Sequence, residues 1–185
     1  MPIELSENAI FLTGLSGSGK SAVGKALSRR LGIKLIDTDT LLARSEHMSV
    51  RKLFEQKGER YFRRRERETI LKLCADLRNT SRKAIVSLGG GSLINHALAN
   101  RVKESGVLIY LQVACADAAG RLLKSDTRPL ILDEAGNKLS RTRLTQRLRE
   151  LLSYRRPGFE RAHYRVPVSG RSAREVCGRI LELLR

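Results

Sequence analysis

The chain has 185 residues, of which 41% are apolar, and its 36 basic residues against 19 acidic ones give a formal charge of +17. This length fits one domain around one core. No apolar run approaches the ~18 residues of a membrane span and no signal-like segment opens the chain, so we expect a cytoplasmic protein without a membrane contact. The cysteines and histidines are scattered, which excludes the close spacing of a zinc site or a Cys-x-x-Cys pair.

The positive charge is compatible with two kinds of partner. A sequence pI near 10.7 is typical of nucleic-acid binders, but the basic residues are dispersed and only 4% of the chain is aromatic. Arginine accounts for 26 of the basic residues, and its guanidinium grips carboxylates and phosphates with two bonds. We therefore expect an enzyme of small anions with no nucleic-acid partner. A basic nucleic-acid-binding module is the alternative.

Short apolar runs alternate with helical patterns along the chain. Strands are predicted at 9–12, 35–36, 84–88, 107–113 and 166–168. Helices are predicted at 21–31, along an apolar face from Phe62 to Leu77, around Leu98 and Val102, at 140–156, where Pro157 would end the helix, and at 173–184. We expect an α/β fold of three layers, with a five-stranded parallel sheet and flanking helices, as a single domain over residues 1–185. A mobile lid is predicted at about 125–138, where proline, glycine and alternating charge meet.

Residues 14–21, GLSGSGKS, match the phosphate-loop pattern G-x-x-x-x-G-K-[ST] between a predicted strand and a predicted helix. Glycines let the backbone N–H groups of such a P-loop surround a phosphate, and the helix N-terminus adds its positive end. The pattern predicts Lys20 at the β- and γ-phosphates and Ser21 on Mg²⁺. ATP and Mg²⁺ are thus the expected cofactors, and the loop's ATP-binding residues would be Ser16, Gly17, Ser18, Gly19, Lys20, Ser21 and Ala22. A flexible glycine turn is the alternative.

Two more segments follow predicted strands. Asp37-Thr38-Asp39 ends the second strand, and the period of two along an extended chain sends both carboxylates to one side, facing the P-loop. One aspartate could order the water of the metal and the other accept a hydroxyl proton, with a helix N-cap as the alternative. Gly89-Gly90-Gly91 would let a ligand approach bare N–H groups, with a plain turn as the alternative.

The P-loop, the paired aspartates, Phe62-Arg63, the triple glycine and Arg128-Pro129-Leu130 occur in the order and spacing of shikimate kinases. The chain resembles that family over nearly its whole length. The resemblance implies a phosphotransferase with an alcohol acceptor, which uses ATP to phosphorylate the 3-hydroxyl of shikimate and yields shikimate 3-phosphate and ADP in aromatic amino acid biosynthesis. The expected ligands are shikimate and ATP, and we expect a monomer.

The resemblance also implies a role for each matching residue. Asp39 would contact the substrate hydroxyls and act as the base, while Asp37 would order the water of Mg²⁺. Lys20 and Arg128 would neutralise charge on the transferring group, with Arg128 carried over ATP by the lid. The residues expected to bind shikimate are Asp39, Arg63, Gly89, Gly90, Gly91 and Arg155, and Arg121, Arg128 and Arg171 would contact the nucleotide. Weaker matches are Phe54 and Phe62, where the family lines the shikimate pocket, and Glu66, where a carboxylate of the family orients a substrate-binding arginine.

Two positions depart from the family pattern. Pro157-Gly158-Phe159 replaces the usual Pro-Leu-Tyr, and Ala173 stands where a proline often packs against adenine. A rival of the same fold is another small-molecule kinase, such as a gluconate or nucleotide kinase. The triple glycine and Arg63 disfavour it.

Overall fold

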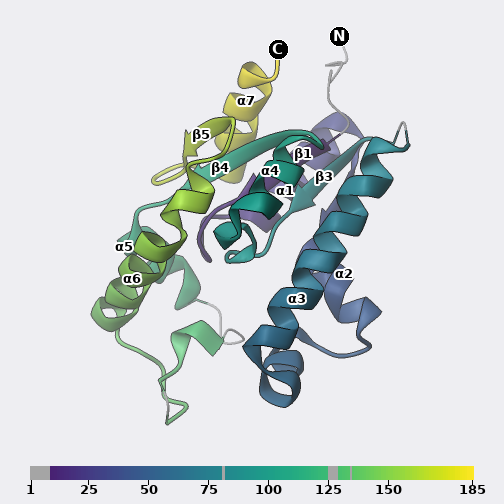
Figure 1. Ribbon diagram of the computed structural model, residues 1–185. Coiled ribbons are helices and arrows are strands. Elements are labelled where there is room, and N and C mark those ends of the chain that lie inside the picture. The colour runs from purple at the N-terminus through teal and green to yellow at the C-terminus, as the bar shows by residue number, and fades with distance from the viewer. Residues whose placement is uncertain (1–8, 81, 125–128, 134) are drawn as a thin grey trace.

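The computed structural model describes residues 9–80, 82–124, 129–133 and 135–185. Within these residues one parallel sheet has five strands in the order β2-β3-β1-β4-β5 (Figure 1). The strands are β1 (Ala9–Thr13), β2 (Lys34–Asp37), β3 (Ala84–Ser87), β4 (Val107–Gln112) and β5 (Tyr164–Pro167). The predicted fold class is confirmed.

The helices cover both faces of this sheet (Figure 1). They are α1 (Lys20–Leu31), α2 (Thr38–Ser45), α3 (Val50–Arg78), α4 (His96–Lys103), α5 (Cys115–Leu122), α6 (Arg141–Phe159) and α7 (Ala173–Leu183), with the 3₁₀ turns η1 (Ser92–Ile94) and η2 (Pro129–Ile131). Alternate residues of β1 divide the core into two layers: Ile10 packs with α1, α5, α6 and α7, whereas Phe11 packs with α3 and α4. Both faces are therefore buried, as parallel sheets require.

The strand register brings the loops that follow β1, β2 and β3 to one edge of the sheet. Thr13 pairs with Tyr110, and both Leu12 and Asp37 align with Ser87. These positions mark the carboxyl ends of neighbouring strands, where open α/β sheets bind their ligands. The edge is thus the place to look for a site.

Most predicted strand and helix bounds agree with the structure to within one residue, but α3 begins at Val50, well before the face predicted from Phe62, and two further boundaries are wrong. The helix at 140–156 does not end before Pro157 but runs to Phe159, because Phe159 is buried and stacks on Tyr110 with ring centroids 5.0 Å apart. The last strand is Tyr164–Pro167 rather than 166–168. Its pairing with β4 begins at Tyr164, which is exposed, so no apolar run marks the start of the strand.

The predicted lid lies partly outside the described residues, which leave out 125–128, including Arg128, and 134. The flanking part folds back on α6: Arg147 donates from Nη1 to the carbonyls of Leu130 and Leu132, at 3.2 and 2.8 Å. Lys138 pairs with Leu132 in an antiparallel bridge. Closure of a lid stays a prediction.

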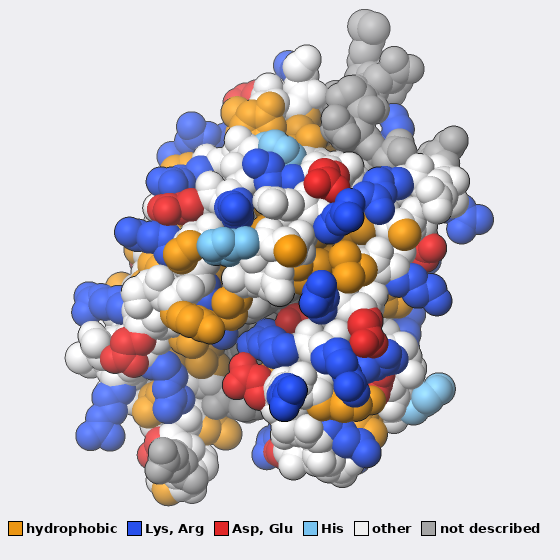
Figure 2. All heavy atoms as spheres, viewed as in Figure 1, with side chains coloured by type: hydrophobic (Ala, Val, Ile, Leu, Met, Phe, Trp, Pro, Cys, Tyr) orange, Lys and Arg blue, Asp and Glu red, His pale blue; other side chains and the backbone are white. Residues whose placement is uncertain are grey.

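The face shown in Figure 2 carries many charged side chains. Acidic side chains lie among the lysines and arginines there, so the basic residues do not form a continuous stripe on this face. No helix in the described part of the chain has the length and apolar character needed to cross a bilayer.

Candidate active site

The P-loop joins β1 to α1 in a conformation that depends on glycine. Gly17 and Gly19 have φ of 84° and 91°, in the left-handed region that strains other residues. Gly19 is also the N-cap of α1 and provides no side-chain cap, so the first N–H groups of the helix remain available to an anion. The alternative of a flexible glycine turn does not exclude a binding role for the P-loop, because this turn presents backbone N–H groups that an anion can bind.

Lys20 begins α1 and folds its side chain back along the loop. Its Nζ donates to the carbonyls of Gly14 and Leu15, at 2.7 and 3.0 Å. The ammonium group is thereby held at the mouth of the loop. A bound phosphate there would be met by a fixed positive charge.

Asp37 and Asp39 both line the cleft at the P-loop, although they belong to different elements. Asp37 ends β2 and caps α2 by accepting from the N–H of Thr40 at 3.1 Å, while Asp39 lies in the first turn of α2. The N-cap interpretation therefore holds for Asp37 and coexists with its place in the cleft. The prediction that both carboxylates face the P-loop is met, but the alternation of side chains along a strand is not the reason, because the chain is already helical at Asp39.

The surroundings of Asp39 favour its protonated form. Desolvation first, and then the charges of Asp37 and Glu66, raise the pKa of Asp39 to about 6, against the opposing effect of Lys20 and Arg63. Its side chain still opens on to the cleft, so solvent and salt screen these interactions. A carboxyl group with this pKa can accept a proton near neutral pH.

Thr38 connects the paired aspartates to Gly89-Gly90-Gly91, called the glycine turn from here on. Its Oγ1 donates to the carbonyl of Ser87 at 3.3 Å and accepts from the N–H of Gly89 at 3.1 Å. A Cβ on Gly89 would lie 2.9 Å from Oδ1 of Asp39 and 2.6 Å from Oε1 of Glu66. A side chain at Gly89 would therefore push these two carboxylates out of their present positions.

Arg63 reaches the same turn from α3. A Cβ on Gly91 would lie 2.8 Å from its Nη1, so the guanidinium lies directly against the glycine backbone. It is paired with Glu66 at 2.9 Å and with Glu59 at 3.3 Å, and it lies 5.2 Å from the ring centroid of Phe62. Phe54 packs on Phe62 with centroids 4.3 Å apart.

Arg155 approaches the turn from α6 on the other side. Its Nη1 donates to the carbonyl of Gly90 at 3.2 Å, and its buried Nε has no hydrogen-bond partner among the described residues. Burial lowers the pKa of Arg155, and the nearby charge of Arg63 lowers it further. Two arginines that repel each other beside bare backbone are suited to a bound anion.

The departure at Gly158 has a structural reason. A Cβ at this position would collide with the carbonyl oxygen of Leu93 in η1. The missing side chain lets α6 approach η1 closely, and Arg155, one turn earlier in α6, reaches the glycine turn from this helix.

Arg121 and Arg171 border a hollow beside the P-loop, and their contact with ATP stays a prediction. Arg121 donates to the carbonyls of Gly17 and Val168, at 3.2 and 3.0 Å, and Arg171 donates to that of Pro167 at 3.3 Å. They line a hollow of about 230 Å³ together with Ala173 and Val176. Ala173, the second departure, thus faces this hollow.

The structure brings most of the predicted residues together. A cleft of about 570 Å³ is lined by Ser16, Gly17, Gly19, Lys20, Ser21, Ala22, Asp37, Asp39, Gly89, Gly90 and Arg121. Ser18 and Arg171 line the adjoining hollow, Arg63 and Gly91 meet at the other end of the glycine turn, and Arg128 lies outside the described residues. The hydroxyl of Ser21 and the carboxylate of Asp37 are oxygen donors of the kind Mg²⁺ prefers, so the cleft fits that ion.

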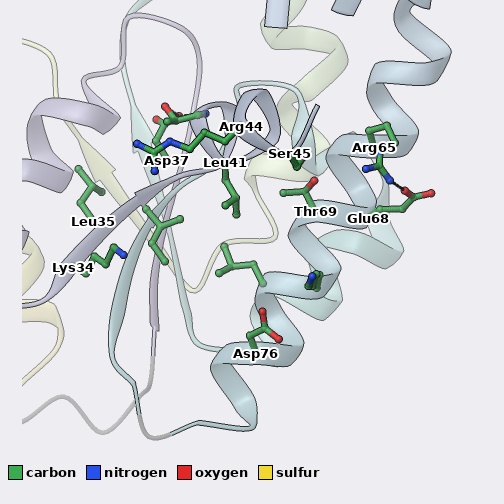
Figure 3. Close-up of a pocket in the computed structure, with 14 residues that line it drawn as sticks. Lys34, Leu35, Asp37, Leu41, Arg44, Ser45, Arg65, Glu68, Thr69 and Asp76 are labelled. Atoms are coloured by element: carbon green, nitrogen blue, oxygen red, sulfur yellow. Dashed lines mark hydrogen bonds and ion pairs between the residues drawn. The ribbon is translucent and has the colours of Figure 1, made fainter. Parts of the chain in front are cut away.

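A second hollow, of about 740 Å³, lies between β2, α2 and α3 (Figure 3). Lys34, Leu41, Arg44 and Asp76 are among the residues around it, and of the predicted site residues only Asp37 borders it. Its lining includes no residue of the P-loop or of the glycine turn, and neither Arg63 nor Arg155. The chemistry of the lining residues, rather than size, thus locates the candidate site.

Sequence reasoning missed several groups that shape the site. Thr38, Ser92 and Glu59 act on the predicted residues through hydrogen bonds and ion pairs. Thr38 could have been found, since it lies between the two aspartates. The spacing of Glu59 and Arg63 by four residues also signals a helical ion pair. No comparable local signal marks the contact between Ser92 and Glu66.

Comparison with known proteins gives a consistent result. The family model described as shikimate kinase matches residues 16–185. The shikimate kinase of Chlorobium phaeobacteroides is 39% identical over 153 residues, covering 83% of this chain and 78% of that protein. That of Salinibacter ruber is 36% identical over 176 residues, covering 95% and 83%.

A solved structure agrees in fold. Shikimate kinase from Acinetobacter baumannii in complex with shikimate superposes with a TM-score of 0.82 at 29% identity, over 96% of this chain and 93% of that one. The match of the family model spans nearly all of the sequence, and relatives above 30% identity cover most of it. The chain therefore belongs to the shikimate kinase family.

Proposed function

We propose that this chain transfers the γ-phosphoryl group of ATP to the 3-hydroxyl of shikimate and releases ADP and shikimate 3-phosphate. The observation that carries the proposal is the pair Arg63 and Arg155 on either side of the glycine turn, next to Asp39. Shikimate has one carboxylate and three hydroxyls. Two arginines can fix such a carboxylate and leave a hydroxyl facing the carboxyl group of Asp39.

In the proposed reaction Asp39 accepts the proton of the 3-hydroxyl while the oxygen of that hydroxyl forms a bond to the γ-phosphorus. The bond from that phosphorus to the bridging oxygen breaks, and the electrons leave with ADP. Lys20 and the N–H groups of the P-loop stabilise charge on the phosphates. When bound at Ser21 and, through water, at Asp37, Mg²⁺ would neutralise phosphate charge.

The remaining expectations belong to this proposal. They are the action of the chain as a monomer, its location in the cytoplasm, and a contact between Arg128 and the phosphates when a lid closes. The nucleotide would lie along the P-loop with its base toward Ala173, since Arg121 and Arg171 border that hollow.

A coupled assay of ADP release tests the function directly. The acceptors are shikimate, quinate, gluconate, AMP and none, each with ATP and Mg²⁺. We expect turnover with shikimate well above all the others. Faster turnover with gluconate or AMP would assign the chain to a different acceptor, and no turnover above the acceptor-free rate would contradict a kinase.

A further inference from the structure

Ser92 is a buried serine beside the site to which the proposed reaction assigns no part. It follows the triple glycine, begins η1 and is 4% exposed. Its Oγ lies 2.7 Å from Oε1 of Glu66 and 3.0 Å from the carbonyl oxygen of Gly89. A serine hydroxyl has one hydrogen, and the Gly89 carbonyl already accepts from the N–H of Ser92. The shorter bond, to a carboxylate, is therefore the one that the hydroxyl makes.

Glu66 depends on that bond because its side chain is almost fully buried. A buried carboxylate needs hydrogen bonds in place of the water it has lost. Within the described part of the chain, Ser92 donates to its Oε1 and Arg63 donates to its Oε2 at 2.9 Å. Ser92 thus fixes one oxygen of the carboxylate, and the orientation of the other oxygen follows.

Arg63 in turn lies between two carboxylates on its own helix. Glu66 holds it at 2.9 Å on the buried side, against Gly91, whereas Glu59 holds it at 3.3 Å with a side chain that is 68% exposed. The first pairing turns the guanidinium toward the glycine turn, and the second draws it toward solvent. The position of Arg63 therefore depends on how firmly Glu66 is held.

We propose that Ser92 is a positioning residue for the acceptor: its hydroxyl fixes Glu66, and Glu66 keeps Arg63 turned inward against Gly91. The proposal rests on the proposed function, in which Arg63 binds the carboxylate of shikimate. Without the hydroxyl, Glu66 lacks one donor in a buried place and shifts. Arg63 then pairs more often with Glu59 and is less often placed for the substrate.

Ser92→Ala tests this role. We expect the KM for shikimate to rise about tenfold, as the loss of a charge-assisted hydrogen bond implies, while the KM for ATP stays unchanged. The kcat should fall less than KM rises, since the variant lacks no group that touches the phosphates. The matched control is Ser105→Ala, because Ser105 is also buried and donates to the carbonyl of Arg101 at 2.7 Å, away from the glycine turn. It should leave the KM for shikimate as it is.

The decisive step adds Glu59→Gln to Ser92→Ala. Glutamine removes the competing charge, so the KM for shikimate should recover by about threefold or more. Because Glu59 contacts Arg63 in the wild type as well, Glu59→Gln alone is the reference, and the recovery in the double variant should exceed the change that Glu59→Gln causes by itself. If Ser92 only supports the fold, Glu59→Gln should have the same effect in both backgrounds. If Ser92→Ala does not fold, Ser92→Cys keeps a small side chain with a weaker donor, and the same addition of Glu59→Gln applies.

An unchanged KM for shikimate in the serine variant, or a raised KM that Glu59→Gln does not lower, would overturn the role of Ser92. Wild-type turnover of shikimate is measured first. A failure of the proposed function would appear in that measurement, before any variant is compared.

Discussion

The two halves of the cleft, which the proposed function assigns to the nucleotide and to the acceptor, are built in different ways. Most of the nucleotide half is one continuous segment, the P-loop and the start of α1, whose donors are mainly backbone N–H groups and Lys20; Arg121 and Arg171 border it from α5 and from the segment after β5. The acceptor half gathers Asp39, Arg63, Glu66 and Arg155 from α2, α3 and α6 around the glycine turn. Its charged side chains hold one another in place.

The two halves should respond differently to substitution for this reason. A backbone cradle tolerates changes in distant side chains, because its donors are fixed by local φ and ψ angles. A network of buried charges transmits each change to its neighbours. Single substitutions should therefore separate ATP binding from acceptor binding.

The largest expected effect lies in the nucleotide half. Lys20→Ala should lower kcat by roughly 10³-fold or more, because it removes the positive charge at the phosphates. Lys25→Ala is the matched control, since Lys25 is an exposed lysine on the same helix. Steady-state kinetics of both variants give the measurement. A kcat for Lys20→Ala within tenfold of wild type would remove this residue from the reaction.

Asp39→Asn should lower kcat by roughly 10²–10⁴-fold through loss of the proton acceptor, while ATP still binds. Calorimetric titration with an ATP analogue tests the second part. Because the folded protein raises the pKa of Asp39 to about 6, the ionised carboxylate destabilises the fold above that pH. The Asn variant should thus have a higher Tm at pH 8, and the gain should vanish near pH 4. Near-normal turnover would leave Asp39 only an orienting role.

The same contrast explains what the sequence could predict. The P-loop was predictable because every residue of it is close in sequence and its pattern is specific. The strands of the sheet were predictable from short apolar runs such as that of β4, whose central residues are buried. The start of β5 was not predictable, since exposed Tyr164 joins the sheet only through its pairing with β4.

In the acceptor half, residues could be named but not their geometry. The resemblance gave Arg63 and Arg155, yet only the fold shows that both lie against the glycine turn and that Gly158 lets α6 approach η1. The end of α6 was misplaced because Pro157 is tolerated where Phe159 packs in the core. Such contacts join residues far apart in sequence, which no local pattern encodes.

Arg63→Lys tests the acceptor half with an intermediate effect. Lysine keeps the charge but loses the two-bond fork, so shikimate binding should weaken by about ten- to a hundredfold while ATP affinity stays the same. Arg64→Lys, an exposed neighbour, is the control.

A shikimate analogue with a neutral amide in place of the carboxylate sharpens the test of Arg63. If Arg63 binds that group, the amide should cost the Lys variant less than it costs the wild type. Fully additive losses would mean that Arg63 acts elsewhere, and the anchoring of the carboxylate would then fall to Arg155 and the glycine turn.

The smallest expected effect is a shift in the pH dependence of the reaction. With the pKa of Asp39 at about 6, kcat/KM should fall as the pH decreases through that value, because the protonated carboxyl group cannot accept a proton. Glu66 contributes to the raised pKa by its negative charge, so Glu66→Gln should move this acid limb to lower pH. The shift should shrink at high salt, since the side chain of Asp39 opens on to the cleft. The KM for shikimate will also rise in this variant as Arg63 loses its buried partner, but a change in binding alone scales kcat/KM at every pH and leaves the midpoint in place. An acid limb that keeps its midpoint in Glu66→Gln would show that the two carboxylates are not coupled, and the raised basicity of Asp39 would then rest on desolvation and Asp37.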